Sequence, residues 1–493
     1  MRFGKILTMA TVPMMILACS EDYKPPVSSD TGNETPAELP GDSILPNIPD
    51  SLLKPITRDY SSIWQNGDGT EANPYQISNE QELRSIAFYV NDSSMTFKGK
   101  FFKQTADIAL TQAWNPIGVY GDNEFGLGNR PFSGTFDGSS KTISGMTITD
   151  TTSYSGLFGL VRGAHVKNVI IKGAKMDVGS YAGVLAGMMD STVVENCTVD
   201  EAQIKGADRV AGLVGEATHL TLNNVLISGS ISGTASVGGV VGRLQNGTLS
   251  SVTNKAAVSG KSTIGGIVGA SASVGNETTI TTAFNYGDVT GSKDVGGVAA
   301  TISSTKLEHS GNYGAVTASE NTMGVVGGAV AVASSKASVN EVFNMGKVSA
   351  TKVMAAGGVI GSMKAIVVTN VFNQGEISGD ASTFKGGIVG IADGVDAKLE
   401  SGYNMGAVPN DNNAGSVAGK VSSTVAVSNI YYDKTVAGAC LIVASQMNME
   451  LPTGFATEDM KASTFIATLN GSGSVWKAGS ATFDGYPVFT WLE

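Results

Sequence analysis

Histidine, cysteine and paired carboxylates are the residues of this chain that could do chemistry, and they are few. The 493 residues include three histidines, His165, His219 and His309. A zinc peptidase needs two histidines four residues apart on a helix, with a glutamate between them, and none of the three has that spacing. Cys197 lies within about one repeat of His165 and His219, but a buried structural cysteine is the commoner arrangement. The sequence therefore predicts no catalytic residue and no metal ligand.

Carboxylates offer a second route to catalysis, because polysaccharide hydrolases use two acids across a cleft. Asp288, Glu376 and Asp380 stand near turns, and Arg209 and Arg243 stand beside glycine-rich elements. These charged residues do not recur as a cluster, and the chain has no long insertion that would build the walls of a cleft. We therefore expect a protein that is not an enzyme and has no cofactor, and keep a carbohydrate-active enzyme with an unrecognised site as an alternative.

The acidic composition limits the partners of the chain. Lys and Arg number 32 against 43 Asp and Glu, which gives a formal net charge of −11. Nucleic acid is bound through a basic surface, so we expect no nucleic-acid partner. Glycine numbers 63, whereas charged residues make up 15% and aromatic residues 7% of the chain. Such a chain makes many turns and buries small aliphatic side chains.

The first residues have the pattern of an export signal. Arg2 and Lys5 precede an apolar run at 6–17 that is too short to span a bilayer comfortably, and Ala18 stands directly before Cys19. This junction resembles the lipobox of bacterial lipoproteins, in which the signal is cut before the cysteine and the thiol is lipidated. We expect a signal peptide at 1–18 and a lipid on Cys19 that anchors the chain to the outer membrane or cell surface, facing either the periplasm or the exterior. An ordinary secretory signal is the alternative.

The segment after the signal is expected to be a tether, and the two remaining cysteines are expected to be free thiols. Six of the 14 prolines fall between Pro25 and Pro49, so residues 19–58 are expected to form an extended spacer. Cys197 and Cys440 are 243 residues apart, near opposite ends of the repeats described below. Since a disulfide needs Cα atoms within about 7 Å, both thiols are expected to be free and buried.

A glycine–aliphatic–any–glycine element recurs ten times between residues 156 and 438. Its first glycines are separated by steps of 27 to 31 residues, a period typical of solenoids in which each unit forms one coil. The ten first glycines are Gly156, Gly183, Gly212, Gly239, Gly266, Gly297, Gly328, Gly358, Gly387 and Gly415.

The coils are expected to be built from β-strands. Val, Ile and Thr occur in runs of three to five, separated by Ser and Gly, and the repeats lack glycine-free stretches long enough for a helix. About 28 residues suit three short strands and three turns per coil, stacked about 4.8 Å apart. The predicted fold is thus all-β, a β-helix of about ten coils with short helices near both ends as caps.

A second signature, Asn–any–Gly, recurs in the later coils. Stacked asparagines can hydrogen-bond from one coil to the next, as in cross-β structures, and the glycine can make a tight corner. We therefore predict a structural ladder rather than a binding site. Its members are Asn254, Asn285, Asn312, Asn344, Asn373 and Asn404, and all but Asn254 have a glycine two residues later.

The two flanks of the array are expected to cover its open ends, because unpaired strand edges promote aggregation. The segment 59–155 is expected to hold an N-terminal cap and the first strands of the solenoid. In it, Ser78 and Gln81 form a capping box for a helix with apolar residues at the spacing of one buried face. In the segment 439–493, a second helix is predicted between Thr457 and Leu469. The four tryptophans lie in these flanks, where packing would explain them: Trp64, Trp114, Trp476 and Trp491.

The glycine element resembles the GLUG motif of bacterial surface proteins. GLFG at 156–159 and GLVG at 212–215 match its core, and NVLISGSISG at 224–233 is similar to its second half. The resemblance covers roughly residues 64–493 and implies an extracellular array of β-coils. GLUG arrays occur in adhesins and before a metallopeptidase domain in some immunoglobulin A peptidases, so the resemblance says little about activity.

Together these observations predict a cell-surface lipoprotein that acts as a non-catalytic binding or adhesion module. Its elongated β-helix would present polar side chains to a host protein, a glycan or a bacterial ligand, through many weak contacts. A structural spacer or accessory subunit of a surface assembly is a further alternative. The ligand, the binding face and the oligomeric state are left open.

Overall fold

A computed structural model of the chain describes residues 63–64, 66–121, 128–149, 151–273, 275, 277–437, 443–444 and 451–492. The expected signal peptide, Cys19, the tether and Cys440 lie outside these residues. Asp59–Glu493 form a compact unit, to which the following description applies.

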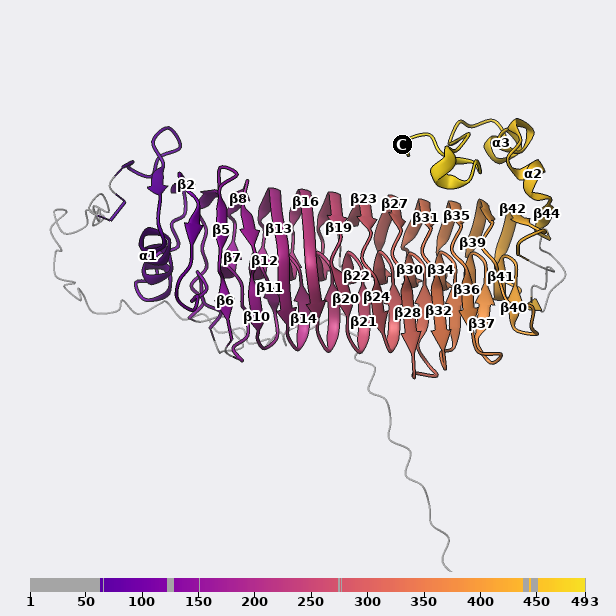
Figure 1. Ribbon diagram of the computed structural model, residues 1–493, viewed down its shortest axis with the longest axis horizontal. Coiled ribbons are helices and arrows are strands. Elements are labelled where there is room, and N and C mark those ends of the chain that lie inside the picture. The colour runs from indigo at the N-terminus through magenta and orange to yellow at the C-terminus, as the bar shows by residue number, and fades with distance from the viewer. Residues whose placement is uncertain are drawn as a thin grey trace, which may run out of the picture. The chain divides into compact units, whose positions relative to one another are not determined.

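The described chain is a parallel β-solenoid, as predicted (Figure 1). Strands make up 52% and helices 7% of it, and the coils number about 12. The number exceeds the ten repeats because strands before residue 156 also form coils. The strand β1 (Tyr75–Ile77) pairs with β2 (Phe101–Gln104), and β2 pairs with β4 (Thr135–Asp137), all in parallel.

Three parallel sheets run along the stack. The largest contains β1, β2, β3 (Ile108–Ala109), β4, β5 (Thr142–Ser144), β6 (Thr147–Ile148), β8 (His165–Lys167), β9 (Ile170–Lys172), β10 (Lys175–Asp177), β13 (Val193–Lys205), β16 (Thr221–Ser232), β19 (Thr248–Asn254), β20 (Ala257–Ser259), β23 (Thr278–Asn285), β24 (Val289–Gly291), β27 (Thr305–Asn312), β28 (Val316–Ser319), β31 (Ser338–Asn344), β32 (Val348–Thr351), β35 (Val367–Asn373), β36 (Ile377–Gly379), β39 (Lys398–Asn404), β42 (Ala426–Asp433) and β44 (Thr453–Phe455).

The second sheet contains β11 (Ala182–Gly183), β14 (Asp208–Ala211), β17 (Ala235–Gly238), β21 (Ser262–Gly265), β25 (Lys293–Gly296), β29 (Val325–Gly327), β33 (Ala355–Gly357), β37 (Phe384–Gly386) and β40 (Ala414–Gly415). The third contains β7 (Phe158–Arg162), β12 (Ala186–Asp190), β15 (Val214–Thr218), β18 (Val241–Gln245), β22 (Val268–Ala272), β26 (Ala299–Ser303), β30 (Val330–Ser334), β34 (Ile360–Lys364), β38 (Val389–Asp393), β41 (Ala418–Val421) and β43 (Val443–Ala444).

A regular coil has four strand segments, where three were predicted. The coil that begins with β18 continues through β19, β20 and β21, and two of these, β19 and β20, belong to the same large sheet. They are separated at Lys255 and Ala256, directly after Asn254. The Asn signature thus marks a bend inside a sheet, which the residue count per coil did not reveal.

The interior of each coil is filled by small aliphatic side chains. Leu249 and Val252 of β19 are fully buried, as is Ile264 of β21. The same alternation recurs in every regular coil, so the apolar positions form continuous columns along the stack. This core is narrow, and it is closed by the glycines discussed below.

The helix α1 (Glu80–Asn91) lies at the N-terminal end of the stack, beside β1 (Figure 1). Its predicted apolar face is buried, but the predicted capping box is displaced by one residue. The cap is Asn79, whose side chain accepts a hydrogen bond from the Glu82 N–H at 3.0 Å, and Glu82 in turn accepts from the Ser78 N–H at 2.6 Å. Asn is as good a cap as Ser, and the acid three residues after it reaches back to the N–H of the residue before the cap, so the arrangement resembles a capping box.

The predicted C-terminal helix is two shorter helices, α2 (Thr457–Met460) and α3 (Ser463–Asn470). The helical path is interrupted at Lys461 and Ala462; the backbone of Ala462 is extended, and this residue precedes α3 without a side-chain cap. A 3-10 helix, η2 (Ala481–Phe483), and a small antiparallel ribbon of β45 (Trp476–Lys477) and β46 (Val488–Phe489) follow.

The expectation that the C-terminal flank covers the open end of the stack is wrong for most of it. After β44 adds one rung to the large sheet, residues 456–492, here named the arm, fold back along the side of the coils (Figure 1). The arm buries its apolar residues against Phe343, Phe372 and Tyr403 of successive coils. Docking on this column of aromatic side chains removes apolar area from water, which stabilises the arm in this position.

Candidate functional site

The six predicted ladder asparagines lie in one fully buried column. Each of the first five donates its Nδ2 to the Oδ1 of the next at 2.8 Å, from Asn254 through to Asn404. The same Nδ2 also donates to the carbonyl two residues later in its own coil, at 2.7–2.9 Å. Every side-chain amide in the column is therefore hydrogen-bonded to other groups of the protein, so the column has a structural role.

The glycine element and the asparagine column are two halves of one contact. A Cβ added to Gly328 would lie 2.0 Å from the Gly358 carbonyl oxygen and 2.3 Å from Cγ of Asn344. The same clash recurs at the first glycines 239, 266, 297, 358 and 387 with the asparagine of their own coil. These glycines are needed for close approach, and so is Gly346 of the Asn–any–Gly pattern, where a Cβ would lie 1.8 Å from the Gly314 carbonyl oxygen.

The arm is held to the coils by hydrogen bonds as well as by apolar contact. Asp433, at the end of β42, accepts from the Tyr486 hydroxyl at 2.5 Å and from the Thr457 hydroxyl at 2.6 Å. Burial alone would raise the pKa of Asp433, but these hydrogen bonds outweigh it and lower the pKa. The Tyr403 hydroxyl donates to the Pro487 carbonyl. Both anchors lie at the C-terminal end of the solenoid.

An open groove of about 390 Å³ lies where the far end of the arm meets earlier coils. We name it the arm groove; it is lined by Thr282, Phe284, Tyr286, Tyr313, Thr482, Phe483, Trp491 and Leu492. Tyr286 and Tyr313 follow the ladder asparagines of neighbouring coils, and their rings stack at 4.6 Å with an angle of 2°. Tyr286 is 48% exposed, although most large apolar side chains of this chain are buried.

A glycine makes room for the aromatic side chains behind the groove. Gly311 occupies the position that carries Phe284 and Phe343 in the flanking coils, and a Cβ there would lie 2.2 Å from the Phe343 ring. The Phe343 ring therefore leans over Gly311 and meets Tyr313 edge-on at 5.3 Å. The ring of Trp491, from the arm, lies 6.2 Å from that of Phe284.

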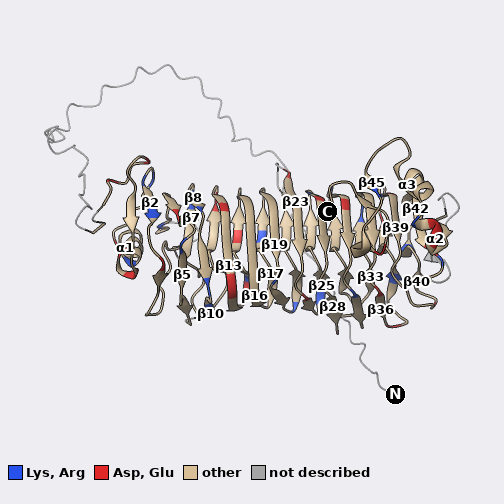
Figure 2. Cartoon of the chain, turned by 45° about the horizontal axis from the view of Figure 1, so that its top comes forward, with Lys and Arg blue, Asp and Glu red and all other residues tan. Residues whose placement is uncertain are grey.

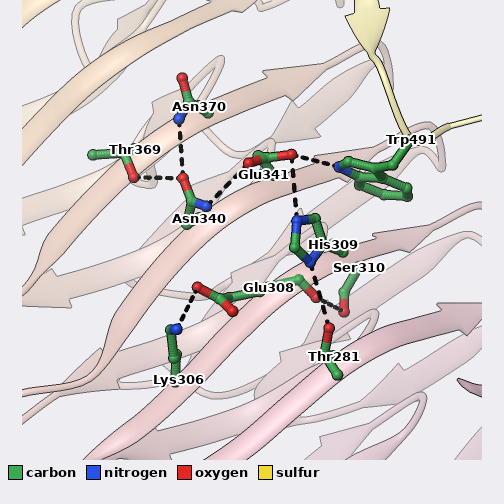
Figure 3. Close-up of polar contacts among 10 residues, drawn as sticks. All are labelled: Thr281, Lys306, Glu308, His309, Ser310, Asn340, Glu341, Thr369, Asn370 and Trp491. Carbon is green, nitrogen blue, oxygen red and sulfur yellow. Dashed lines mark hydrogen bonds and ion pairs between the residues drawn. The ribbon is translucent and has the colours of Figure 1, made fainter. Parts of the chain in front are cut away.

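A chain of polar contacts fixes Trp491 at the groove (Figure 3). Its indole Nε1–H donates to Glu341 Oε2 at 2.6 Å, and the same carboxylate lies 3.5 Å from His309 Nε2. Glu341 is held from its other side by Asn340, whose Nδ2 donates to Glu341 Oε1 at 3.3 Å. Asn340 in turn accepts from Thr369 at 2.8 Å and from Asn370 at 3.0 Å.

The same series of polar contacts includes a hydroxyl, an imidazole and a carboxylate, one after another. This is the order of groups in a nucleophilic triad. The Thr281 hydroxyl lies 3.5 Å from His309 Nδ1, and His309 Nε2 lies 3.5 Å from Glu341. Both separations exceed the roughly 2.6–3.2 Å at which a base takes a proton. The shortest contact of Glu341 is with Trp491, so the carboxylate positions the indole.

The other two histidines also face carboxylates of neighbouring coils. His165 Nε2 lies 2.8 Å from Glu195, and His219 Nδ1 lies 3.7 Å from Asp190. Both contacts lie on the outer surface, and Asp190 also pairs with Arg162 at 3.2 Å. Within the described residues no three His, Cys, Asp or Glu side chains gather to hold a metal ion.

Cys197 is a buried thiol outside any of these clusters. It is free, and burial raises its pKa to about 12. The thiolate population at neutral pH is therefore very small, and the residue belongs to the packed interior of β13.

Charged residues are scattered over the coils in the view of Figure 2. Several form pairs between successive coils, for example Lys347 with Glu376 at 3.1 Å and Lys172 with Asp200 at 3.4 Å. The acids and bases considered in the sequence lie apart: Asp288 Oδ1 accepts from the Ala315 N–H, and Asp380 Oδ2 from the Lys352 N–H. Arg209 pairs with Glu216 at 2.9 Å and lies over the ring of Tyr181.

Comparison with known proteins gives partial likenesses. No family model matches the chain. A stretch of 168 residues, 31% of this chain, is 29% identical to halomucin of Haloquadratum walsbyi, of which it spans 2%. A stretch of 151 residues, 27% of this chain, is 32% identical to a protein of Evansella cellulosilytica proposed to be a Gly-rich membrane protein, of which it spans 16%. The matched regions thus cover a small part of both relatives.

Among solved structures, the chain is similar to a Bacteroides ovatus protein proposed to be an immunoglobulin A1 protease. The alignment covers 87% of this chain and 96% of that one, with 17% sequence identity and a TM-score of 0.29. A likeness of this degree carries no argument about activity. Separately, none of the helices in the described ranges is long and apolar enough to cross a membrane.

Proposed function

We propose that this protein is a lipid-anchored, non-catalytic binding module displayed outside the cytoplasm of a bacterium. The observation that carries the proposal is the arm groove, in which Tyr286 keeps 48% of its surface exposed beside Trp491. Aromatic side chains that stay exposed next to polar groups are typical of binding sites. The groove is formed by the coils and the arm together, so the solenoid both displays the site and builds it.

The sequence and the relatives support a position at the cell surface. The run ILAC at 16–19 has the pattern of a lipoprotein signal, and a lipid on Cys19 would supply an anchor. The two sequence relatives are named a halomucin and a membrane protein. Those names suit a protein associated with a surface or membrane, and a spacer at 19–58 would hold the coils away from the bilayer.

A structural spacer is the second candidate, and the regular stack favours it. About 12 coils with buried hydrogen-bonded asparagines form a continuous rod, which would suit a part of a surface assembly. A carbohydrate-active enzyme remains the third candidate; the loose Thr281–His309–Glu341 contacts described above do not favour it.

A binding screen separates the first two candidates. Residues 59–493, which form a compact unit, are labelled and applied to arrays of host glycans, extracellular-matrix proteins and bacterial cell-envelope fractions. A binding module gives at least one saturable signal that weakens when an arm-groove residue is replaced. A spacer gives no ligand on the host arrays and binds a bacterial envelope protein through another face.

A further inference from the structure

We infer that the arm groove binds an uncharged saccharide, with the ring of Tyr286 as its stacking surface. The inference rests on the proposed binding function and names the class of ligand. It follows from three properties of the groove: a fixed aromatic surface, hydroxyl groups at its rim, and no net charge in its lining.

The aromatic surface is rigid before any ligand arrives. Tyr286 is stacked on Tyr313 at 4.6 Å, and Tyr313 is held edge-on by Phe343 at 5.3 Å. The apolar C–H face of a pyranose ring carries partial positive charge and is attracted to the negative face of such an aromatic ring. Because the rings are already ordered by the coil spacing, binding orders few side chains and costs little entropy.

Hydroxyl groups stand beside this aromatic surface. Thr282 lines the groove from the coil side and Thr482 from the arm side, so a ring that lies between them has a donor and acceptor on each wall. The groove of about 390 Å³ is within the usual range of small-ligand sites and suits a few sugar units.

The charge distribution favours an uncharged sugar over an acidic one. None of the eight residues that line the groove, all of them described, is charged. Lys255 holds the position of Tyr286 in the preceding coil, and Glu341 is bound behind Trp491, so the two flanking charges have opposite sign. A polyanionic glycan would also be repelled by the overall charge of −11.

Trp491 acts as a positioning residue for one wall of this site. The bond from its indole to Glu341 fixes the last residues of the arm over Phe284, so the groove exists only while the arm is docked. Glu341 therefore belongs to the support of the site and not to its lining.

The test is calorimetric titration of residues 59–493 with maltoheptaose, cellohexaose and mannohexaose, and in parallel with hexagalacturonate and a proline-rich decapeptide. Each is repeated with Tyr286→Ala, with Thr482→Val, and with Phe88→Ala as a matched control, since Phe88 is 56% exposed on α1, away from the groove. At least one uncharged oligosaccharide should bind. Tyr286→Ala should weaken it about tenfold, as expected for one aromatic contact, and Phe88→Ala should leave it unchanged.

Three results would overturn the inference: no binding of uncharged oligosaccharides, binding of only the galacturonate or the peptide, or equal binding by Tyr286→Ala and Phe88→Ala. Circular dichroism of Tyr286→Ala checks that the coils are intact. If the protein gives a signal in the binding screen that Thr482→Val weakens but that Tyr286→Ala and added oligosaccharides do not change, the proposed function stands and the saccharide site is wrong. If the binding screen also gives no signal, both the proposed binding function and the saccharide site are wrong.

Discussion

Replacing one interior asparagine of the ladder should destabilise the whole solenoid more than its size suggests. The side chain of Asn344 takes part in four hydrogen bonds, all in the buried interior. Its Nδ2 donates to Gly346 O at 2.7 Å and to Asn373 Oδ1 at 2.8 Å. Its Oδ1 accepts from the Gly346 N–H at 3.2 Å and from Asn312 Nδ2 at 2.8 Å.

The magnitude follows from the partners that Asn344→Ala leaves behind. Asn312 and Asn373 each keep a bond within their own coil, whereas the N–H and C=O of the buried Gly346 lose these side-chain partners. A buried polar group left without a partner costs about 1–3 kcal/mol, so we expect a loss of roughly 3–5 kcal/mol in the free energy of unfolding. Asn254→Ala should cost about 1 kcal/mol less, because Ile227 precedes it in the column and donates no hydrogen bond.

The assay is urea unfolding of residues 59–493, followed by circular dichroism in the β-sheet region. Asn223→Ala is the matched control, since Asn223 is exposed on β16 and accepts only from the Ser250 hydroxyl at 3.1 Å. The control should lie within about 0.5 kcal/mol of wild type. Equal effects of Asn344→Ala and Asn223→Ala would refute the argument that the ladder is a structural element. Equal effects of Asn344→Ala and Asn254→Ala would refute the prediction that the first asparagine of the ladder contributes less stability than an interior one.

Three further predictions concern the arm, the buried thiol and the anchor. Docking of the arm lowers the pKa of Asp433 below its unfolded value, so the stabilisation is complete above about pH 4 and is lost as the pH falls through the folded pKa. Limited proteolysis at acid and neutral pH should show the arm cleaved first at acid pH, and Asp433→Asn should remove that dependence. Cys197 should resist a thiol reagent such as dithionitrobenzoate at neutral pH until the protein is unfolded, because burial raises its pKa to about 12; fast labelling of the native protein would contradict the packing. Finally, Cys19→Ser should move the protein from the detergent phase to the aqueous phase in a detergent partition of cells; unchanged partition would rule out the lipid.

The period of the solenoid could be predicted because each coil places the same residue types at the same position. First glycines recur every 27 to 31 residues and the ladder asparagines every 27 to 32, and each asparagine side chain faces its copy in the next coil. What the sequence did not show is that Gly328 and Asn344 touch, since 16 residues separate them along the chain. Their contact becomes visible only when the coil is closed, and it explains why the two patterns occur together.

The candidate site could not be predicted, because it is made from distant parts of the chain. Trp491 is joined to Glu341, 150 residues earlier. The sequence predicts that this tryptophan packs in a terminal cap. The arm instead docks on a column of aromatic residues that are far apart along the chain: Phe343, Phe372 and Tyr403. The exposed Tyr286 was visible in the sequence as the residue after a ladder asparagine, but its exposure depends on where the arm ends.

The central claim is that this chain binds a ligand outside the cell through the arm groove. The most direct test is attachment of cells that display the full-length protein to surfaces coated with whichever glycan or matrix protein is found in the screen. Cells with the wild-type protein or Phe88→Ala should attach equally well, and cells with Tyr286→Ala should attach as weakly as cells that lack the protein. Attachment that is the same with and without the protein would contradict the claim and favour a structural spacer.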